Sequence, residues 1–569
     1  MKKHYIYLNL LFLISTALNA TIIKVPDDKS KIQLAVNEAV NGDTVLVSPG
    51  TYFENVNFHN KNIVLTSYYL LNSDTSYIRT TIIDGSNPSN SDTASCIIIA
   101  KGQDSTTVLQ GFTITGGQGT KWKDEHSSGT YCEGGGILIA FASPVIQHNL
   151  IVNNAATNDA GLQGTGGGGM RCGDGRPKIL NNAIVNNTGK YGAGIVLNWC
   201  GAIIRNNIIA GNIGGQEYGG GGVWINNTNG KSNILENNTI VNNYSTTTGG
   251  GILMYSSAAK ATLKNNIIYG NIALSSPQIT LGSSISATYC NIDGGWTGIG
   301  NISNLPNFKD STYNLSNSSP DIDAGDASVT FNDLSDKINT NRAQLPSLGG
   351  LRNDIGAYGG QGASVFPYFQ FSRIGMVSTK ISLGNKNSIG QLVKQKIKIV
   401  NQSTEVRKID SVTIMLHKDQ LNVAYLKSSG FEPAQTDSIV VQWNPVSVDA
   451  FLDTILIYHD AINTKNPIKI SVSGKASNPL SIKNSSIDNV FENFPNPFSD
   501  KTNIVYSLKD QQASIVIYNI LGDVIKYYDK LNGSGSVCFE GSALPNGVYI
   551  YKLITPDQNE VINKMLIQH

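Results

Sequence analysis

Short apolar segments alternate with asparagine and glycine through the first half of the chain, and one phrase returns five times. The five copies are PVIQHNLIVNN (144–154), PKILNNAIVNN (177–187), AIIRNNIIAGN (202–212), NILENNTIVNN (233–243) and ATLKNNIIYGN (261–271). A glycine-rich piece lies before each copy, as in GGGILI at 134 and GGGVWI at 220. The pattern predicts short β-strands separated by turn residues, with no helical period between 97 and 290.

The copies are unevenly spaced, because their inner asparagines lie 33, 25, 31 and 28 residues apart. Such spacing indicates a constant core with variable loops, which is typical of a β-solenoid whose coils stack on one another. Three columns of apolar side chains are then expected to point inward, with strands about 4.8 Å apart from coil to coil. The columns are Ile146, Ile179, Ile204, Leu235 and Leu263; Ile151, Ile184, Ile209, Ile240 and Ile268; and Ile139, Cys172, Leu197, Ile225 and Met254.

The inner asparagines are Asn149, Asn182, Asn207, Asn238 and Asn266. At a bend, a side-chain amide can bond its own backbone and tolerate a left-handed conformation, and identical amides one coil apart can bond each other. We therefore interpret these residues as a structural ladder. The glycine triplets have a similar interpretation, because glycine permits positive φ and close approach of backbones.

The N-terminal half resembles a known family. The stretch KIQLAVNEAVNGDTVLVSPGTYFENVNF (31–58), followed by IIDG, LQGFTITGG and the repeats, is similar to the right-handed parallel β-helix proteins related to pectate lyases. Residues 301–360 resemble the closing segment that often follows such helices in large exported bacterial proteins. The resemblance implies a right-handed parallel β-helix over 21–362, and it indicates fold more than activity.

Two further modules are expected after Pro367. Alternating strands such as KQKIKIVNQS and DTILIYHD predict an immunoglobulin-like β-sandwich over 367–477, and a polar linker follows at 478–490. The phrases FPNPFSDKTNIVYSL, ASIVIYNILGDVI and LPNGVYIYKL in 491–569 resemble the C-terminal sorting domain of the type IX secretion system. This resemblance implies handling by that secretion machinery, passage across the outer membrane and a Bacteroidetes-like source. The expected fold is all-β: a right-handed parallel β-helix (solenoid) followed by two small β-sandwich domains.

The ends and the composition limit the function further. Residues 1–20 have the layout of a signal peptide, with cleavage after either Ala17 or Ala20, and no later segment is apolar enough to span a membrane. The 42 Lys+Arg balance 41 Asp+Glu, which argues against a nucleic-acid partner. Six cysteines without a C-x-x-C pair argue against zinc or redox chemistry, and the sequence pairs none of them in disulfides.

The loops on one edge of the solenoid are the expected binding face, because insertions in repeat proteins tend to gather on one side. The longest are predicted at 118–133 and 155–166. Aromatic residues in these and the shorter loops suit sugar rings, which have an apolar face and a hydroxylated rim. The predicted carbohydrate-binding residues are Trp122, Tyr131, Tyr191, Tyr218 and Tyr244.

Catalysis is a weaker expectation. A lyase for uronic acids needs a base and a cation beside the carboxylate. The candidate bases are Lys121, Arg171 and Lys190. Calcium is the one cofactor considered, and its candidate ligands are Asp124, Glu125 and Asp159. A second spacing that could ligate calcium, Asp321, Asp323 and Asp326, has a simpler interpretation as turn-forming residues.

Three functions remain open from the sequence. The first is a secreted or cell-surface protein that binds extracellular polysaccharide. The second is a polysaccharide lyase that cleaves uronic-acid polymers by β-elimination, and the third is a non-catalytic adhesin or structural surface protein. A glycoside hydrolase is disfavoured, because no pair of carboxylates at a set separation is visible.

Overall fold

The computed structural model describes residues 20–124, 126, 129–156, 162–228, 230–280, 284–369, 374–376, 380–384, 387–401, 403, 405–425, 430–432, 435–461, 466–477, 491–555 and 560–569. Some sequence predictions lie outside these ranges: the signal peptide up to residue 19, the linker 478–490, and the calcium candidates Glu125 and Asp159.

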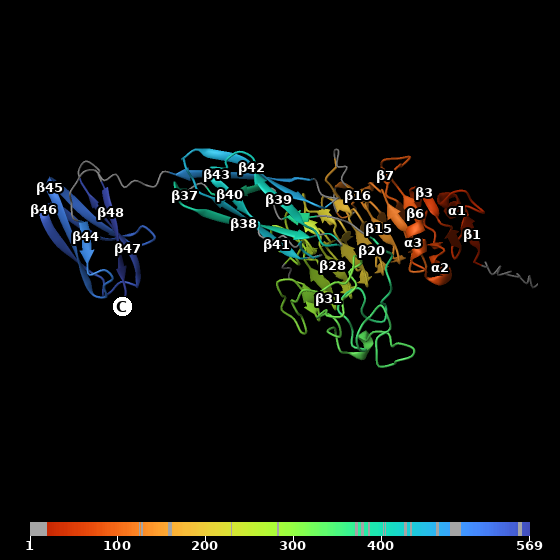
Figure 1. Cartoon of the computed structure of the whole chain (residues 1–569). Helices are drawn as coiled ribbons and strands as arrows, with labels where there is room; N and C mark the ends of the chain where they lie inside the picture. Colours follow the sequence, from red (N-terminus) through yellow and green to blue (C-terminus); the bar gives the residue numbers. More distant parts are fainter. Residues whose placement is uncertain are drawn as a thin grey trace, which may run out of the picture. The chain divides into compact units, whose positions relative to one another are not determined.

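The solenoid is built from parallel sheets that take one short strand from each successive coil. In Figure 1 the strands β3, β6, β15, β20 and β28 of one sheet follow one another along its axis. The first sheet consists of β1 (Ile22–Val25), β2 (Thr44–Val47), β5 (Val64–Ser67), β9 (Val108–Gln110), β14 (Val145–Gln147), β19 (Lys178–Leu180), β23 (Ile203–Arg205), β27 (Asn233–Glu236), β31 (Ala261–Lys264) and β33 (Ile285–Thr288).

The second sheet consists of β3 (Gly50–Phe53), β6 (Thr81–Asp84), β10 (Thr113–Thr115), β15 (Leu150–Val152), β20 (Ala183–Val185), β24 (Ile208–Ala210), β28 (Thr239–Val241), β32 (Ile267–Tyr269) and β34 (Asn291–Ile292). The third consists of β4 (Val56–Asn57), β8 (Ile97–Ala100), β13 (Ile137–Ala140), β18 (Met170–Gly173), β22 (Ile195–Asn198), β26 (Val223–Ile225) and β30 (Ile252–Met254). A narrow parallel sheet joins β16 (Ala155–Ala156), β21 (Thr188–Gly189), β25 (Ile213–Gly214) and β29 (Tyr244–Ser245).

The predicted register of the coils is confirmed. Ile146 pairs with Ile179, Ile179 with Ile204, and the column continues through Leu235 to Leu263. The other two predicted columns are paired in the same way, and all three belong to one continuous apolar core. Burial of each aliphatic side chain contributes about 1.5 to 3 kcal/mol, so stacking supplies the stability that a globular core supplies elsewhere.

The asparagine ladder is also confirmed, and a second one runs beside it. Asn207 shows the pattern: its Nδ2 donates to the Oδ1 of Asn238, while its own Oδ1 accepts from the Nδ2 of Asn182, at 3.0 and 3.1 Å. The second ladder uses the last asparagine of each phrase, as where Asn187 donates to Asn212 at 3.1 Å. Both rows are buried, and each amide forms hydrogen bonds with buried polar groups that would cost free energy if they were left without a partner.

A short helix closes the N-terminal end of the core. Helix α1 (Ile32–Glu38) buries Ile32, Ala35 and Val36, and all three belong to the solenoid core. This placement agrees with a capping role for the opening segment. The helices α2 (Tyr69–Asn72) and α3 (Ser76–Thr80) lie in the connection between β5 and β6.

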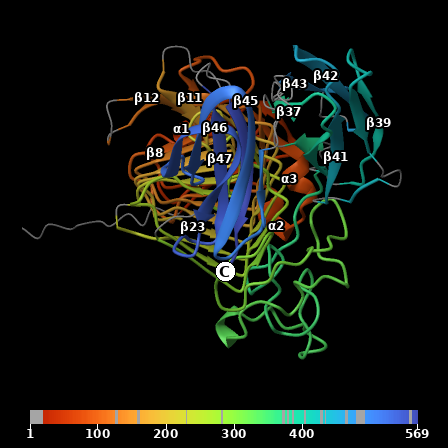
Figure 2. The same ribbon diagram turned by 90° about the vertical axis from the view of Figure 1, so that its left-hand side faces the viewer.

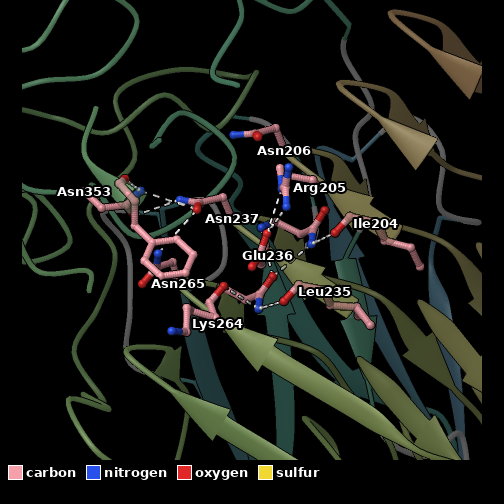
Figure 3. Close-up of polar contacts among 12 residues, drawn as sticks. Ile204, Arg205, Asn206, Leu235, Glu236, Asn237, Lys264, Asn265 and Asn353 are labelled. Atoms are coloured by element: carbon pink, nitrogen blue, oxygen red, sulfur yellow. Dashed lines mark hydrogen bonds and ion pairs between the residues drawn. The ribbon is translucent and has the colours of Figure 1, made fainter. Parts of the chain in front are cut away.

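The segment after the last coil, 301–362, folds back along the stack and is held by the outer asparagines Asn206, Asn237 and Asn265. Asn237 has a left-handed φ of 50°, which turns its side chain away from the inner ladder. Its Nδ2 donates to the Oδ1 of Asn353 and to the carbonyl oxygen of Asp354, both at 2.9 Å, as seen in Figure 3. Asn206 similarly donates to the carbonyl oxygen of Gly359 at 2.7 Å.

Charged residues on the same strands reinforce this attachment. Lys264 in β31 forms an ion pair with Asp326 at 2.7 Å and lies 4.2 Å from the ring centre of Phe331, which ends the short 3-10 helix Val329–Phe331. Arg205 and Glu236, from the neighbouring strands, pair with each other (Figure 3). The Arg205, Glu236 and Lys264 column therefore lies along the attached segment.

Three of the buried aspartates of this closing segment, Asp321, Asp333 and Asp354, have raised pKa values. Asp321 accepts from Asn291 Nδ2 at 2.8 Å, and Asp354 accepts from the backbone N–H groups of Asp323 and Leu348 at 2.8 and 2.7 Å. Burial raises the pKa of Asp321 to about 8 and that of Asp354 to about 7. Burial and the nearby Asp354 carboxylate raise the pKa of Asp333 to about 8.

These raised pKa values predict a loss of stability at alkaline pH. The pKa of Asp321 is about 8 in the folded chain, against 3.8 in the unfolded chain. The protonated carboxyl therefore stabilises the fold fully below the unfolded-state pKa, and this contribution is lost as the pH rises through the folded-state pKa. We expect the melting temperature of the mature chain to fall between about pH 5 and about pH 8. In Asp321→Asn the melting temperature, followed by circular dichroism, should fall less over the same pH range. An unchanged dependence of the melting temperature on pH would contradict the raised pKa of Asp321.

Two further sheets follow the solenoid in sequence, the first antiparallel and the second mixed, because β36 and β37 run parallel to β43. One joins β35 (Ile374–Met376), β38 (Val393–Asn401), β41 (Thr436–Trp443) and β40 (Leu421–Ala424). The other contains β36 (Lys380–Ser382), β43 (Ile468–Ser477), β42 (Ala450–His459) and β39 (Ile409–Ile414), and β37 (Asn387–Ser388) also pairs with β43.

The C-terminal part is a separate sheet of longer strands: β44 (Phe491–Phe494), β45 (Lys501–Tyr518), β46 (Val524–Glu540), β47 (Gly547–Ile554) and β48 (Glu560–Ile567). It has its own apolar cluster, which includes Ile515, Tyr551 and Met565. In the described parts of the chain, no helix has the length and apolar content needed to span a bilayer. All six cysteines lie in the described ranges as free thiols, and only Cys538 is exposed.

Candidate functional site

A small side sheet lies against the outer face of the third solenoid sheet. It joins β7 (Thr93–Ala94), β11 (Gly119–Lys123), β12 (Thr130–Glu133) and β17 (Gly164–Gly166). The sequence predicts a loop at 118–133, but its ends form an antiparallel hairpin in which Trp122 pairs with Tyr131. Aromatic residues at facing positions favour strand pairing, which explains the difference. Figure 2 shows β11 and β12 at the outer edge of the coils.

The outward column of the third sheet is buried. Leu138, Arg171, Val196, Trp224 and Leu253 lie on adjacent strands in that order, and each is at most 5% exposed. An outward column would normally face water. Here it supports a layer of aromatic side chains from the coil edges, and the two layers pack together.

Five aromatic side chains form a continuous wall over this column, which we call the aromatic wall: Tyr131, Tyr191, Tyr218, Trp224 and Tyr255. The ring centres of Tyr191 lie 5.4 Å from Tyr218 and 5.3 Å from Trp224. The ring centre of Tyr255 lies 4.8 Å from Trp224 and 5.8 Å from Tyr218. Trp224 is only 5% exposed and Tyr255 is 47% exposed, so the wall extends from the interior to the surface.

Small residues make room for the wall. A β-carbon at Gly166 would lie 2.4 Å from the Tyr191 ring, and one at Gly164 would lie 3.2 Å from Tyr218. Both glycines belong to β17, which is parallel to β12. Only glycine therefore leaves space for Tyr191 beneath the side sheet.

A buried ion pair fixes the inner end of the wall. Glu133 accepts from the Tyr191 hydroxyl at 2.6 Å and from Arg171 Nε at 3.1 Å. Arg171 also donates to the carbonyl oxygen of Ile139 and lies 5.6 Å from the Trp122 ring centre. Burial opposes the charge on Arg171, but Glu133 and other nearby acidic groups hold its pKa above the usual value. Burial and Glu133 together raise the pKa of Tyr191 well above its ordinary value, so its hydroxyl stays a donor.

Polar groups complete a cavity of about 150 Å³ against the wall, which we call the aromatic cavity. They are Asp124, Glu133, Asn198 and Asn226. Asn226 donates to Asn198 at 3.0 Å, and Asn198 donates to Asp124 at 3.4 Å. A volume below the usual 300 to 1,000 Å³ of drug-sized sites suits one small ring or head group rather than a large ligand.

The predicted sugar-binding residues divide into three groups. Tyr131, Tyr191 and Tyr218 line the aromatic cavity. Trp122 lies behind it, against Arg171 and Phe141, and its indole nitrogen is buried without a hydrogen-bond partner in the described part of the chain. Tyr244 lies in β29 of the narrow parallel sheet and is not among the lining residues.

Each predicted base has an acidic partner. Lys121 pairs with Asp92 at 2.6 Å, Lys190 with Glu217 at 3.2 Å, and Arg171 with Glu133. An arginine whose pKa is raised does not accept a proton, so Arg171 holds the wall in place rather than acting as a base.

Of the three calcium candidates, only Asp124 lies within the described ranges. Asp124 lines the aromatic cavity, but no group of three or more His, Cys, Asp or Glu that could hold a metal ion occurs in those ranges. Asp326 is paired with Lys264 and accepts from Ser328, so it forms a turn and an ion pair.

Sequence reasoning did not select Trp224, Tyr255, Glu133, Asn198 or Asn226 as ligand-binding residues. Trp224 was visible as a large aromatic residue in a largely apolar outward column, which is a signal for a covered surface. Asn198 ends β22, and Asn226 directly follows the equivalent strand β26 one coil later. Tyr255 had no such signal, because its position depends on where its turn lies over the neighbouring coil.

Comparison with solved structures gives only distant likeness. The chain is 10% identical to latent PorU from Porphyromonas gingivalis, with 34% of this chain and 20% of that one covered and a TM-score of 0.12. It is 10% identical to the secreted serine protease VesC from Vibrio cholerae, with 34% and 46% covered and a TM-score of 0.16. The D00-D0 domain of intimin is 14% identical, with 32% and 95% covered and a TM-score of 0.13. No curated protein matches the sequence.

The C-terminal sheet is the part with a family match. Residues 492–568 match the secretion system C-terminal sorting domain, the family of modules that marks proteins for type IX secretion. The chain therefore carries a type IX sorting domain at its C-terminal end, and it is cargo delivered to the cell surface or the extracellular space.

Proposed function

We propose that this exported protein binds an extracellular polysaccharide through the aromatic cavity of its solenoid. The observation that carries the proposal is the aromatic wall beside polar groups at one cavity. A pyranose ring has an apolar face that packs on aromatic rings and hydroxyl groups that need hydrogen-bond partners. Here the rings of Trp224 and Tyr255 supply the apolar contact, and Asn198, Asn226 and Asp124 supply donors and acceptors.

The geometry favours binding over cleavage. Both oxygens of Glu133 already accept hydrogen bonds, one from Tyr191 and one from Arg171. The candidate bases are paired with acids, and Tyr191 keeps its proton because of its raised pKa. A β-elimination needs a group free to remove the α-proton, so a lyase is the less supported function.

The same proposal includes three features that the sequence resemblances imply. They are the right-handed, pectate-lyase-like character of the solenoid over 21–362, the immunoglobulin-like character of 367–477, and display on a Bacteroidetes-like cell. In this arrangement the solenoid carries the ligand, the sandwich acts as a spacer, and the sorting domain directs export.

The test is a polysaccharide array probed with the mature chain, together with the variant Tyr255→Ala. Tyr255 is the exposed end of the aromatic wall, and its ring contacts Tyr218 and Trp224, so its loss should not disturb the coils. We expect affinity for the retained polysaccharide to fall about five- to tenfold, since aromatic contacts of this kind contribute about 0.5 to 1.5 kcal/mol beyond burial.

A matched control is Tyr458→Ala, which removes an exposed tyrosine of β42, far from the solenoid in sequence. The affinity of Tyr458→Ala for the retained polysaccharide should equal that of the unaltered chain. If no polysaccharide is retained, or if both variants bind equally well, the cavity is not the binding site.

A further inference from the structure

The aromatic cavity has a charge character that restricts its ligand. Two carboxylates line it, Asp124 and Glu133, and no lysine, arginine or histidine is among the described lining residues. The Glu133 charge is offset by Arg171, which lies behind the wall with its Nε 3.1 Å from Glu133 Oε2. Asp124 forms no ion pair with a cation in the described part of the chain, and the charge of Arg171 acts on it only from beyond ion-pair distance.

Asp124 is held so that its charge faces the ligand space. Its Oδ1 accepts from the backbone N–H of His126 at 2.8 Å, and its Oδ2 is 3.4 Å from Asn198 Nδ2. The ring of the nearby His126 is directed elsewhere: it contacts Asp174 at 2.6 Å and stacks on Trp199. The carboxylate therefore remains available to an incoming donor or cation.

The aromatic wall adds to this negative character. The face of each ring carries a negative partial charge, so several rings around one point attract a cation. The ring centre of Tyr191 lies 5.4 Å from that of Tyr218 and 5.3 Å from that of Trp224, and Tyr255 closes the outer side. A wall of rings beside a carboxylate that forms no ion pair is an arrangement that can recognise an ammonium group.

The same features disfavour an acidic sugar. The carboxylate of a uronic acid would enter beside Asp124 and Glu133 with no lining cation to neutralise it. Placing like charges together in a partly buried site costs binding energy. A neutral sugar would meet no such cost, but it would leave Asp124 without a charged partner.

We propose that the sugar unit that enters the aromatic cavity carries a protonated amine, as in a deacetylated amino-sugar polymer. The inference rests on the proposed polysaccharide-binding function and narrows its ligand class. The ammonium group lies against Trp224 and Tyr255 and pairs with Asp124, while Asn198 and Asn226 contact the ring hydroxyls. The same cavity disfavours uronic acids, the ligand class considered for a lyase from the sequence.

The experiment compares four short oligosaccharides of equal length by isothermal titration calorimetry with the full mature chain: oligomers of glucosamine, N-acetylglucosamine, glucose and glucuronic acid. We expect the glucosamine oligomer to bind about tenfold more tightly than the two neutral ones, and the glucuronic acid oligomer to bind most weakly. Raising the salt from about 0.05 M to about 0.5 M should weaken only the glucosamine complex.

The informative variant is Asp124→Asn, which keeps the size and hydrogen bonding of the side chain and removes its charge. Its affinity for the glucosamine oligomer should fall about tenfold, to the level of the neutral oligomers, and its affinity for the neutral oligomers should be unchanged. The matched control is Asp92→Asn, because Asp92 pairs with Lys121 and does not line the cavity. Asp92→Asn should bind the glucosamine oligomer with the same affinity as the unaltered chain.

The outcomes separate the two proposals. Equal affinity for cationic and neutral oligomers, or tighter binding of glucuronic acid, would overturn the amino-sugar inference and leave polysaccharide binding standing. Binding of choline as tight as that of the glucosamine oligomer would also overturn it, because the sugar ring would then contribute nothing. Failure of every oligomer and of the polysaccharide array would reject the proposed function itself.

Discussion

Replacing Asn207 by alanine is expected to lower the free energy of unfolding of the solenoid by about 3 kcal/mol or more, because several buried polar groups lose their partners at once. The Nδ2 of Asn207 donates to the carbonyl oxygens of Ile179 and Arg205 and to Asn238 Oδ1, at 2.8, 3.0 and 3.0 Å. Its Oδ1 accepts from the backbone N–H of Asn182 at 2.9 Å. The change should appear in urea unfolding of the mature chain, followed by circular dichroism.

Two further variants make this result specific. Asn207→Asp keeps the shape and the acceptor but loses every donated hydrogen bond and buries a charge, so it should destabilise at least as much as alanine does. Asn87→Ala removes an exposed asparagine of the same solenoid and should change the free energy of unfolding by less than about 0.5 kcal/mol. A value for Asn207→Ala in that small range would show that the ladder does not stabilise the coils.

Breaking the Arg171 and Glu133 pair is expected to have the second large effect. Their side chains are only 1% and 5% exposed, so either single change leaves an uncompensated charge in the interior. For Glu133→Gln we expect the free energy of unfolding to fall by about 3 to 5 kcal/mol. The same variant should also weaken polysaccharide binding, because the Tyr191 hydroxyl loses its ionised acceptor and the inner end of the wall loosens.

The double variant Arg171→Met with Glu133→Gln distinguishes charge burial from simple loss of packing. It removes both charges and should recover much of the stability lost in Glu133→Gln alone. A surface pair offers the comparison: Lys552 and Glu560 are 29% and 42% exposed, and Glu560→Gln should cost less than about 1 kcal/mol. Additive effects of the two buried changes would show that the ion pair is not energetically coupled.

The repeating part of the fold could be predicted because its information is local. A strand alternates its side chains between two faces, so the apolar positions of each phrase identify the inward columns without knowledge of the rest of the chain. The paired asparagines mark each bend, and their recurrence sets the register between coils. Ile146, Ile179 and Ile204 accordingly stack as predicted.

The roles within each Asn-Asn pair were only half predicted. The second asparagine points inward and forms the ladder, as expected, while the first adopts a left-handed φ and points outward. Asn206 and Asn237 use that outward position to hold the closing segment, more than 110 residues later in the chain. Identical residue types thus bind different partners, which a repeat pattern does not distinguish.

The candidate site combines predicted and unpredicted residues. Tyr131, Tyr191 and Tyr218 were selected because they lie in loops on one edge, and they do line one cavity. The acidic character of that cavity was not foreseen, because it depends on Arg171 lying behind the wall, paired with Glu133, and on the absence of any other lining cation in the described residues.

By itself, the sequence determined the solenoid, its inward columns, its asparagine ladder and the sorting domain at its C-terminal end, because each depends on periodic or contiguous residues. Only the tertiary structure decided which outward residues are covered, where the closing segment attaches and which side chains form the aromatic cavity. Those features join coils and loops of unequal length. The contact between Tyr218 of one coil edge and Tyr255 of another is therefore set by how the coils stack and not by any spacing along the chain.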